Sequence, residues 1–102
     1  MIRAAVHRID LGGDKRGREQ RGRRYGVILS VTDWNMVTVV PTSTSAQPSP
    51  FRPQVELMGT PTRLLVDQIR SLDTQYVHEV VDFLPRVEME ALEHATRRYL
   101  GL

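Results

Sequence analysis

Two absences narrow the possibilities for this 102-residue chain. It contains no cysteine, which excludes disulfides, thiolate metal sites and cysteine nucleophiles, and which fits a reducing compartment. It also has no apolar run near the ~20 residues that cross a bilayer, and charges interrupt its first residues, MIRAAVHRIDLGG, too often for a signal peptide. The sequence therefore predicts one cytoplasmic domain over residues 1–102, with no membrane segment.

Positive charge is present but unevenly distributed. The net charge is +2, yet residues 15–24, KRGREQRGRR, hold six cations against the single carboxylate of Glu19, so this segment carries +5 and the rest of the chain −3. Five of the six cations are arginine, whose planar fork suits phosphate. The segment indicates a localised anionic partner. A solvated basic loop without a partner has the same composition, so charge alone leaves both readings open.

Short apolar segments separated by turn residues predict a mostly β architecture. Strands are expected over residues 2–11, 25–31, 36–42, 54–58 and 63–72, with a weaker sixth over 77–83. Turns are expected at 33–35 and 59–61, and the proline-rich segment 43–53 is expected to be a loop.

The C-terminal segment predicts an α-helix that begins near Pro85 and ends at Gly101. Its expected buried stripe consists of apolar residues at helical spacing, namely Val87, Ala91, Leu92, Ala95 and Tyr99. Five or six strands followed by one helix predict a small antiparallel barrel or strongly curled sheet, with the helix on the sheet or against a partner subunit.

Three blocks of sequence together resemble a known protein family. Residues 16–24, RGREQRGRR, followed by an apolar strand, resemble the loop Gly-Ser-Glu-Gln-x-Gly-x-Arg-Pro of the MazF/PemK toxins. Residues 39–42, VVPT, resemble the end of its third strand, which closes on Thr or Ser, and residues 65–73, LVDQIRSLD, resemble its acidic-Gln-Ile-Arg strand. The blocks occur in the family's order and spacing, and the resemblance spans nearly the whole chain. Arg18 stands where Ser is common, and Tyr25 stands where Pro usually follows the arginine.

The resemblance implies an SH3-like barrel of the CcdB/MazF type and a homodimer. It implies metal-independent, cofactor-free cleavage of single-stranded RNA, inhibition of translation and growth, and neutralisation by a cognate antitoxin with an acidic C-terminal segment. By position, Arg24 and Thr42 match the family's catalytic pair, and Glu19 matches a proposed base. The residues expected to bind RNA are Arg16, Arg18, Gln20, Arg21, Arg23, Ser43 and Gln68.

This chemistry needs no metal, because the 2′-hydroxyl of RNA is a built-in nucleophile. Arg24 suits the stabilisation of phosphorane charge, and Thr42 can donate its hydroxyl to the same oxygens. Glu19 is a candidate base, although the surrounding arginines lower its basicity. The general acid stays open, since the three histidines His7, His78 and His94 do not fall on the family's functional positions.

Two other functions remain possible from the sequence. A CcdB-like inhibitor of DNA gyrase would share the barrel but lacks the Glu-Gln-x-Gly-x-Arg loop. A non-catalytic nucleic-acid-binding module would explain the basic segment, but not the arrival of Thr42, Gln68 and Arg70 in the family's register.

Overall fold

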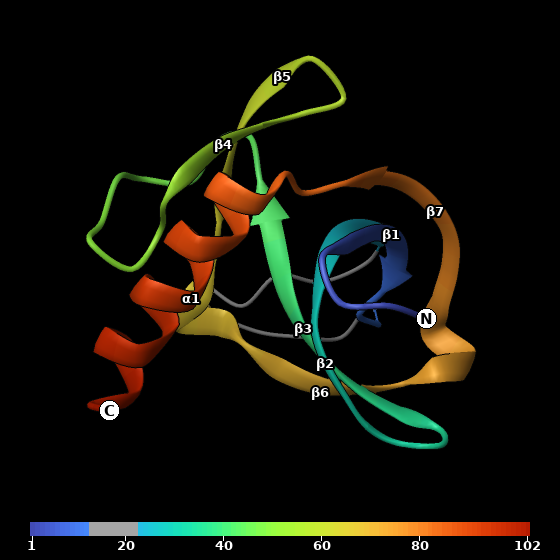
Figure 1. Ribbon diagram of the computed structural model, residues 1–102. Helices are drawn as coiled ribbons and strands as arrows, with labels where there is room; N and C mark the ends of the chain where they lie inside the picture. Colours follow the sequence, from blue (N-terminus) through green and yellow to red (C-terminus); the bar gives the residue numbers. More distant parts are fainter. Residues whose placement is uncertain (13–22) are drawn as a thin grey trace.

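The computed structural model describes residues 1–12 and 23–102 (Figure 1); for Arg23 and Asp33 it describes the backbone but not the side chain. In chain order the described elements are β1 (Ala5–Asp10), β2 (Arg23–Asp33), β3 (Met36–Ser43), β4 (Gln54–Leu57), β5 (Thr60–Leu64), the 3₁₀ turn η1 (Val66–Gln68), β6 (Arg70–Asp73), the 3₁₀ turn η2 (Thr74–Tyr76), β7 (Val77–Phe83) and α1 (Arg86–Leu100). The predicted mostly β fold with a C-terminal helix is confirmed.

The strands form one antiparallel sheet that branches at β3. Its main path runs β4-β5-β3-β2-β1-β7. One edge of β3 pairs with β2, whereas the other edge pairs with β6 through residues 36–39 and with β5 through residues 42–43. Strand β3 therefore passes from one part of the sheet to the other near residues 40–41, and it lies at the centre of the fold (Figure 1).

Pro41 lies at this crossing point. Its carbonyl oxygen accepts a hydrogen bond of 2.8 Å from the N–H of Leu65, in the segment that leads from β5 to η1. The backbone N and C=O of one strand residue point to the same edge, so the N–H that proline lacks would also have faced Leu65. Only an acceptor is needed there, which explains how a proline is accommodated inside a sheet.

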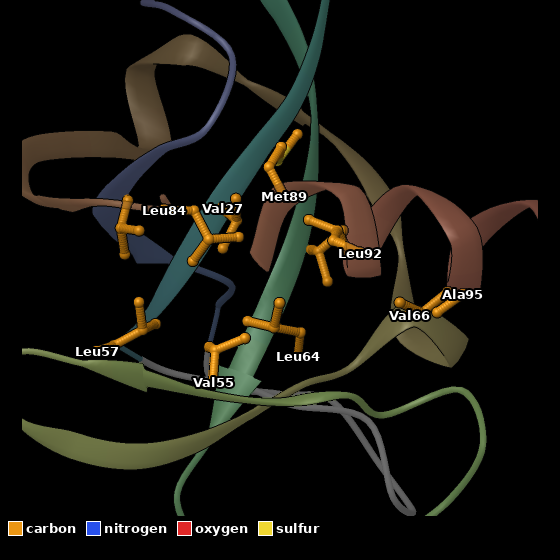
Figure 2. Packing of buried hydrophobic residues seen from close by; sticks show 11 residues of the cluster. Val27, Val55, Leu57, Leu64, Val66, Leu84, Met89, Leu92 and Ala95 are labelled. Atoms are coloured by element: carbon orange, nitrogen blue, oxygen red, sulfur yellow. The ribbon is translucent and has the colours of Figure 1, made fainter. Parts of the chain in front are cut away.

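Two apolar cores lie on opposite faces of the central strands. The helix-side core lies between the sheet and α1 (Figure 2) and contains Val6, Val27, Val40, Val55, Leu57, Leu64, Val66, Leu84, Met89, Leu92 and Ala95. The opposite core contains Ala5, Ile9, Leu11, Ile28, Val37, Val39, Leu72 and Val77. Successive residues of the central strands alternate between the two cores, because strand side chains point to alternate faces.

The prediction of one continuous strand over residues 63–72 is wrong. Strand β5 ends at Leu64, and β6 begins only at Arg70, with η1 between them. Leu64, Leu65 and Val66 are all fully buried. Three consecutive buried side chains do not fit a strand that buries one face; the chain instead leaves the strand after Leu64 and enters the 3₁₀ turn at Val66, so that all three point into the interior.

Two smaller boundaries also differ from the sequence-based expectation. Strand β1 begins at Ala5 rather than Ile2, because Ala4 has a positive φ of 73°. The β4–β5 turn consists of Met58 and Gly59, with φ values of 51° and 76°, and not of residues 59–61. Positive φ at both central residues is the pattern of a two-residue type I′ hairpin, which is why the turn is so short. The predicted strand over 77–83 is confirmed as β7.

The helix is confirmed, but the predicted buried stripe is partly wrong. Leu92 and Ala95 are buried as expected, whereas Val87, Ala91 and Tyr99 are exposed, Val87 by 77%. The pattern omitted Met89 and Thr96, which are buried; the Thr96 hydroxyl donates a hydrogen bond of 2.7 Å to the carbonyl of Leu92 and so can be buried. Gly101 ends the helix with φ of 75°, as expected. No described helix is long and apolar enough to span a membrane.

The observed helix face makes a testable prediction. Replacing Leu92, which is fully buried in the helix-side core, with Ala should lower the free energy of unfolding by about 2–5 kcal/mol. Replacing the exposed Val87 with Ala should change it by less than about 0.5 kcal/mol. Urea unfolding of both variants measures the two values. Equal losses would mean that the helix packs through the stripe predicted from sequence.

Candidate active site

A row of polar side chains crosses the sheet where β3 leaves β2. Ser43 of β3 pairs with Arg63 of β5, and Arg63 pairs in turn with Gln54 of β4. The β2–β3 pairing ends at Gly26 and Pro41, and Arg24 and Ser43 each lie two residues beyond it, on the same face of the sheet. Directly opposed residues of antiparallel strands, such as Ser43 and Arg63, have Cβ atoms about 5 Å apart. Four strands contribute one residue each to the group Arg24, Ser43, Arg63 and Gln54, called here the polar row.

The polar row shares its face of the sheet with the opposite core. Arg24 pairs directly with Ile9, and Ser43 lies in strand phase with Val39; both apolar residues belong to the opposite core. Arg63 is out of phase with the helix-side residues of β5. Arg24 is exposed, whereas Ser43 and Arg63 are half-buried. The row is thus a polar, solvent-accessible continuation of a buried apolar face.

Thr42 lies next to Ser43 but faces the other way. It pairs with Leu64, is in strand phase with Val40, and is only 4% exposed. Its side chain therefore belongs on the helix-side face, away from Arg24. The hydroxyl oxygen of Ser43 accepts a hydrogen bond of 3.2 Å from the N–H of Ser45. Of the residues assigned to the site from sequence, the structure brings Arg24 and Ser43 to one face and places Thr42 on the other.

A third arginine lies on the same face as the polar row. Arg70 of β6 pairs directly with Val39, so its side chain shares the face of the opposite core, and it is half-buried. Gln68, at the end of η1, is also half-buried and lies two residues before Arg70. This face therefore carries Arg24, Arg63 and Arg70, a concentration of positive charge suited to a phosphate chain.

An ion pair fixes the loop before β4 to η1. The guanidinium of Arg52 donates two hydrogen bonds to the carboxylate of Asp67, from Nε at 3.0 Å and from Nη2 at 2.8 Å. These hydrogen bonds, together with the charge of Arg52, lower the pKa of Asp67 below its ordinary value, against the opposing effect of burial. The Tyr99 hydroxyl donates to the Asp67 carbonyl at 3.4 Å, and its ring meets Phe51 edge-on, with centroids 5.3 Å apart.

The sequence did not reveal Arg63 or the Arg52–Asp67 pair as parts of the site. Neither arginine falls within the blocks that resemble the toxin family. Alternation within 60–64 could have indicated the face of Arg63, but its place beside Ser43 depends on which strand β5 pairs with, and a local pattern does not show that.

The remaining predicted site residues lie outside the described part of the chain. These residues are Arg16, Arg18, Glu19, Gln20 and Arg21, and only the backbone of Arg23 is described, at the start of β2. Their assignments as base and as RNA contacts remain predictions.

His7 is the buried histidine of the described residues. It is 5% exposed, and its Nδ1 donates a hydrogen bond of 2.7 Å to the carbonyl of His78. Its Nε2 is buried without a hydrogen-bond partner among the described residues. His7 pairs with Gly26, where an added Cβ would lie 2.7 Å from Cδ1 of Ile9. A larger residue at Gly26 would therefore displace the buried Ile9 side chain. His78 and His94 are exposed.

Within residues 1–12 and 23–102, no three His, Cys, Asp or Glu side chains gather closely enough to hold a metal ion. The polar groups assembled on the face of the opposite core are arginines, a hydroxyl and amides, which hold phosphate oxygens by hydrogen bonds. The arrangement is suited to an anionic polymer.

The family comparison agrees with this chemistry. Residues 2–100 match the family of PemK-like, MazF-like toxins of type II toxin–antitoxin systems. A curated Mycobacterium tuberculosis protein with a provisional designation as a toxin is 60% identical over 105 residues, which cover 100% of this chain and 99% of that protein. The chain belongs to the PemK-like, MazF-like toxin family of type II toxin–antitoxin systems.

Solved structures show the same fold at lower sequence identity. MazF from Deinococcus radiodurans superposes with a TM-score of 0.82 at 23% identity, covering 98% of this chain and 96% of its own. A mycobacterial endoribonuclease in complex with its cognate antitoxin gives 0.81 at 20% identity, covering 100% and 96%. The Mycobacterium tuberculosis toxin MazF-mt6 gives 0.78 at 19% identity, covering 96% and 97%. The expected barrel of the MazF type is therefore confirmed.

The Arg52–Asp67 pair predicts a pH-dependent contribution to stability. A double-mutant cycle with Arg52→Met and Asp67→Asn should give a coupling energy on the order of 1 kcal/mol at neutral pH, since the pair is bidentate and mostly shielded. Because the folded-state pKa of Asp67 is lowered, this coupling is complete above the unfolded pKa of about 3.9 and is lost as the pH falls through the folded pKa.

Urea unfolding of the four proteins across this pH range measures the coupling. The matched control is the pair Arg8–Glu79, which is also bidentate, at 3.0 and 3.1 Å, but lies on the surface. Its coupling should be smaller and should disappear in high salt. A coupling at Arg52–Asp67 that persists unchanged in acid would contradict the assignment of the effect to the Asp67 carboxylate.

Proposed function

We propose that this toxin is a sequence-specific, metal-independent endoribonuclease that cuts single-stranded RNA in the cytoplasm and thereby inhibits translation and growth. The single observation that carries the proposal is the polar row, in which Arg24 and the Ser43 hydroxyl share one accessible face. Family membership supports it, as does the fold shared with a mycobacterial endoribonuclease.

In the proposed reaction, the 2′-hydroxyl of RNA attacks the adjacent phosphorus. Its proton passes to a base, for which Glu19 is the candidate, and the bond to the 5′-oxygen breaks as that oxygen takes up a proton. The products are a 2′,3′-cyclic phosphate and a 5′-hydroxyl. Arg24 offers paired N–H donors to the phosphorane oxygens, whose negative charge grows in the transition state.

We assign the catalytic hydroxyl that acts together with Arg24 to Ser43 rather than to Thr42. The sequence match placed the catalytic hydroxyl at Thr42, but that side chain is 4% exposed and in phase with the helix-side core. Ser43 is half-buried and lies on the same face of the sheet as Arg24. A hydroxyl must come within about 3 Å of a phosphate oxygen to donate a hydrogen bond, which favours the accessible one.

The proposal includes a homodimer and a cognate antitoxin. An acidic C-terminal segment of the antitoxin would compete with RNA for the arginines on the face of the opposite core. The description of one neighbour as a complex with its cognate antitoxin supports such a partner. A CcdB-like gyrase inhibitor or a plain nucleic-acid-binding module remains the alternative, and cleavage of RNA by the pure protein separates these functions.

Purified protein should cut single-stranded RNA in the presence of EDTA, because the nucleophile is the 2′-hydroxyl and not a metal-bound water. A substrate with a 2′-deoxy sugar on the 5′ side of the scissile phosphate should resist cleavage. Arg24→Ala should lower kcat by about 10²–10³, as for the loss of an oxyanion donor. Mapping the 5′ ends of cleaved transcripts gives the site and the end chemistry. Activity that depends on added Mg²⁺ would overturn the mechanism.

The two adjacent hydroxyls give a matched pair of variants. Ser43→Ala should lower kcat at least about tenfold, since a hydrogen bond to a charged group contributes ~1.5–3 kcal/mol. Thr42→Val keeps the shape of a buried side chain, so its main effect should be on the melting temperature. Steady-state kinetics and thermal unfolding of both variants make the comparison. Loss of turnover in Thr42→Val, with activity retained in Ser43→Ala, would return the role to Thr42.

A further inference from the structure

We infer that Arg63 is a second phosphate-binding arginine, which holds an RNA phosphate next to the one held by Arg24, and that the carbonyl of Arg52 positions it. The inference rests on the proposed function for its substrate, a single-stranded RNA. It deepens the proposal by naming a binding residue that lies outside the sequence blocks shared with the family.

The position of Arg63 follows from the polar row. Ser43 pairs directly with Arg63 of β5, and Arg24 of β2 lies on the same face of the sheet, on the other side of β3. The two arginines therefore lie on opposite sides of the strand that carries the Ser43 hydroxyl. A polynucleotide that crosses these strands presents successive phosphates, so Arg24 can hold one phosphate and Arg63 the next.

The guanidinium of Arg63 makes one hydrogen bond within the described residues and has further N–H groups that can bind a ligand. Its Nη1 donates a hydrogen bond of 3.0 Å to the carbonyl oxygen of Arg52, its one side-chain hydrogen bond within the described residues. An arginine fork has five N–H donors, so this bond restricts the side chain while leaving donors for a ligand. Restriction before binding lowers the entropic cost of immobilising a long side chain on RNA.

Arg52 itself is unsuited to the same role. All three nitrogens of its guanidinium are engaged, since Nε and Nη2 donate to the Asp67 carboxylate and Nη1 donates to the carbonyl oxygen of Gln47 at 3.4 Å. Its charge is neutralised by Asp67, which leaves its backbone carbonyl as the group that acts on the site. The ion pair fixes Arg52, and the Arg52 carbonyl fixes the Arg63 guanidinium. Asp67 is in this sense a positioning residue for Arg63.

If Arg63 had a purely structural role, the fold would depend on the contacts of its side chain. Its partner is a backbone carbonyl, and on the β4 side it faces the exposed Gln54. It is absent from the salt bridges of the described residues. A cation without a nearby carboxylate partner, on a face that carries two other arginines, has its charge available for an anion.

The test compares Arg63→Gln with Arg98→Gln, which removes the same charge from the exposed end of α1. On a short RNA that the wild type cleaves, Arg63→Gln should raise KM about five- to tenfold with kcat within about threefold, because a phosphate contact away from the reacting centre acts on ground and transition states alike. Arg98→Gln should match the wild type. Arg63→Lys should recover only part of the affinity, since a single nitrogen cannot reproduce the planar fork, in which separate nitrogens face the carbonyl and the phosphate.

A binding arm separates this inference from the proposed function. A fluorescein-labelled single-stranded DNA of the same sequence has the phosphates but no 2′-hydroxyl. The slope of log K against log salt should fall by about 0.7 in Arg63→Gln, the change expected for one lost phosphate contact on a single strand, and stay at the wild-type value in Arg98→Gln. If the wild type cuts no RNA, yet the salt slope for DNA binding is lower in Arg63→Gln than in the wild type, the endoribonuclease proposal fails and Arg63 stands as a phosphate ligand.

The positioning step has its own readout. Asp67→Asn should raise KM in the same direction as Arg63→Gln, and the double variant should be no worse than Arg63→Gln alone, since Asp67 acts through Arg63. Additive losses would overturn the role of Asp67. Unchanged KM and an unchanged salt slope in Arg63→Gln, with active wild-type enzyme and an unaltered melting temperature, would overturn the inference for Arg63.

Discussion

Strand β3 has to satisfy three pairing partners at once, and the geometry of the site depends on how it does so. Its first half binds β2 and β6, while its last two residues bind β5. At the crossing, Pro41 presents only an acceptor, which the N–H of Leu65 uses. Because β5 takes over the edge of β3 from β6 at this point, Ser43 acquires Arg63 as its neighbour. The branching of the sheet therefore places Arg63 beside Ser43 in the site.

Alternation along β3 then divides two adjacent hydroxyls between two environments. Thr42 joins the helix-side core, and Ser43 joins the polar row. The same rule assigns Arg24, Arg63 and Arg70 to one face, although they come from β2, β5 and β6. Strand phase, together with the pairing of β5 and β6 with β3, thus brings positive charge to the face that carries the Ser43 hydroxyl. The Arg52–Asp67 pair adds rigidity where the chain between β3 and β4 has no regular structure.

The sequence was sufficient for the family, the mostly β fold and the terminal helix, because each depends on local patterns or on ordered motifs. It failed where burial was not one-sided. Leu64, Leu65 and Val66 alternate plausibly with their neighbours, yet all three are buried, because β5 ends at Leu64 and the 3₁₀ turn begins at Val66. The helix face was partly misjudged, because Met89 and Thr96 are buried in place of Val87, Ala91 and Tyr99, and the Thr96 hydroxyl is satisfied by a hydrogen bond within its own helix. The place of Arg63 depends on strand pairing, which is set by tertiary packing and not by any window of residues.

The pairing of β1 with β7 joins the first and the last strand in chain order, since Ala5 lies opposite Phe83. The hairpin at Met58 is also tied to β7, through a hydrogen bond of 2.8 Å from its N–H to the Asp82 carboxylate. Contacts between segments so distant in sequence slow folding, because their loop-closure entropy is lost before the contacts form. On the ribosome, β1 and β4 are made long before β7 emerges. The edge of β1 can therefore be covered only after β7 has been translated, and a toxin built this way exposes one edge of its first strand while the six other strands are being made.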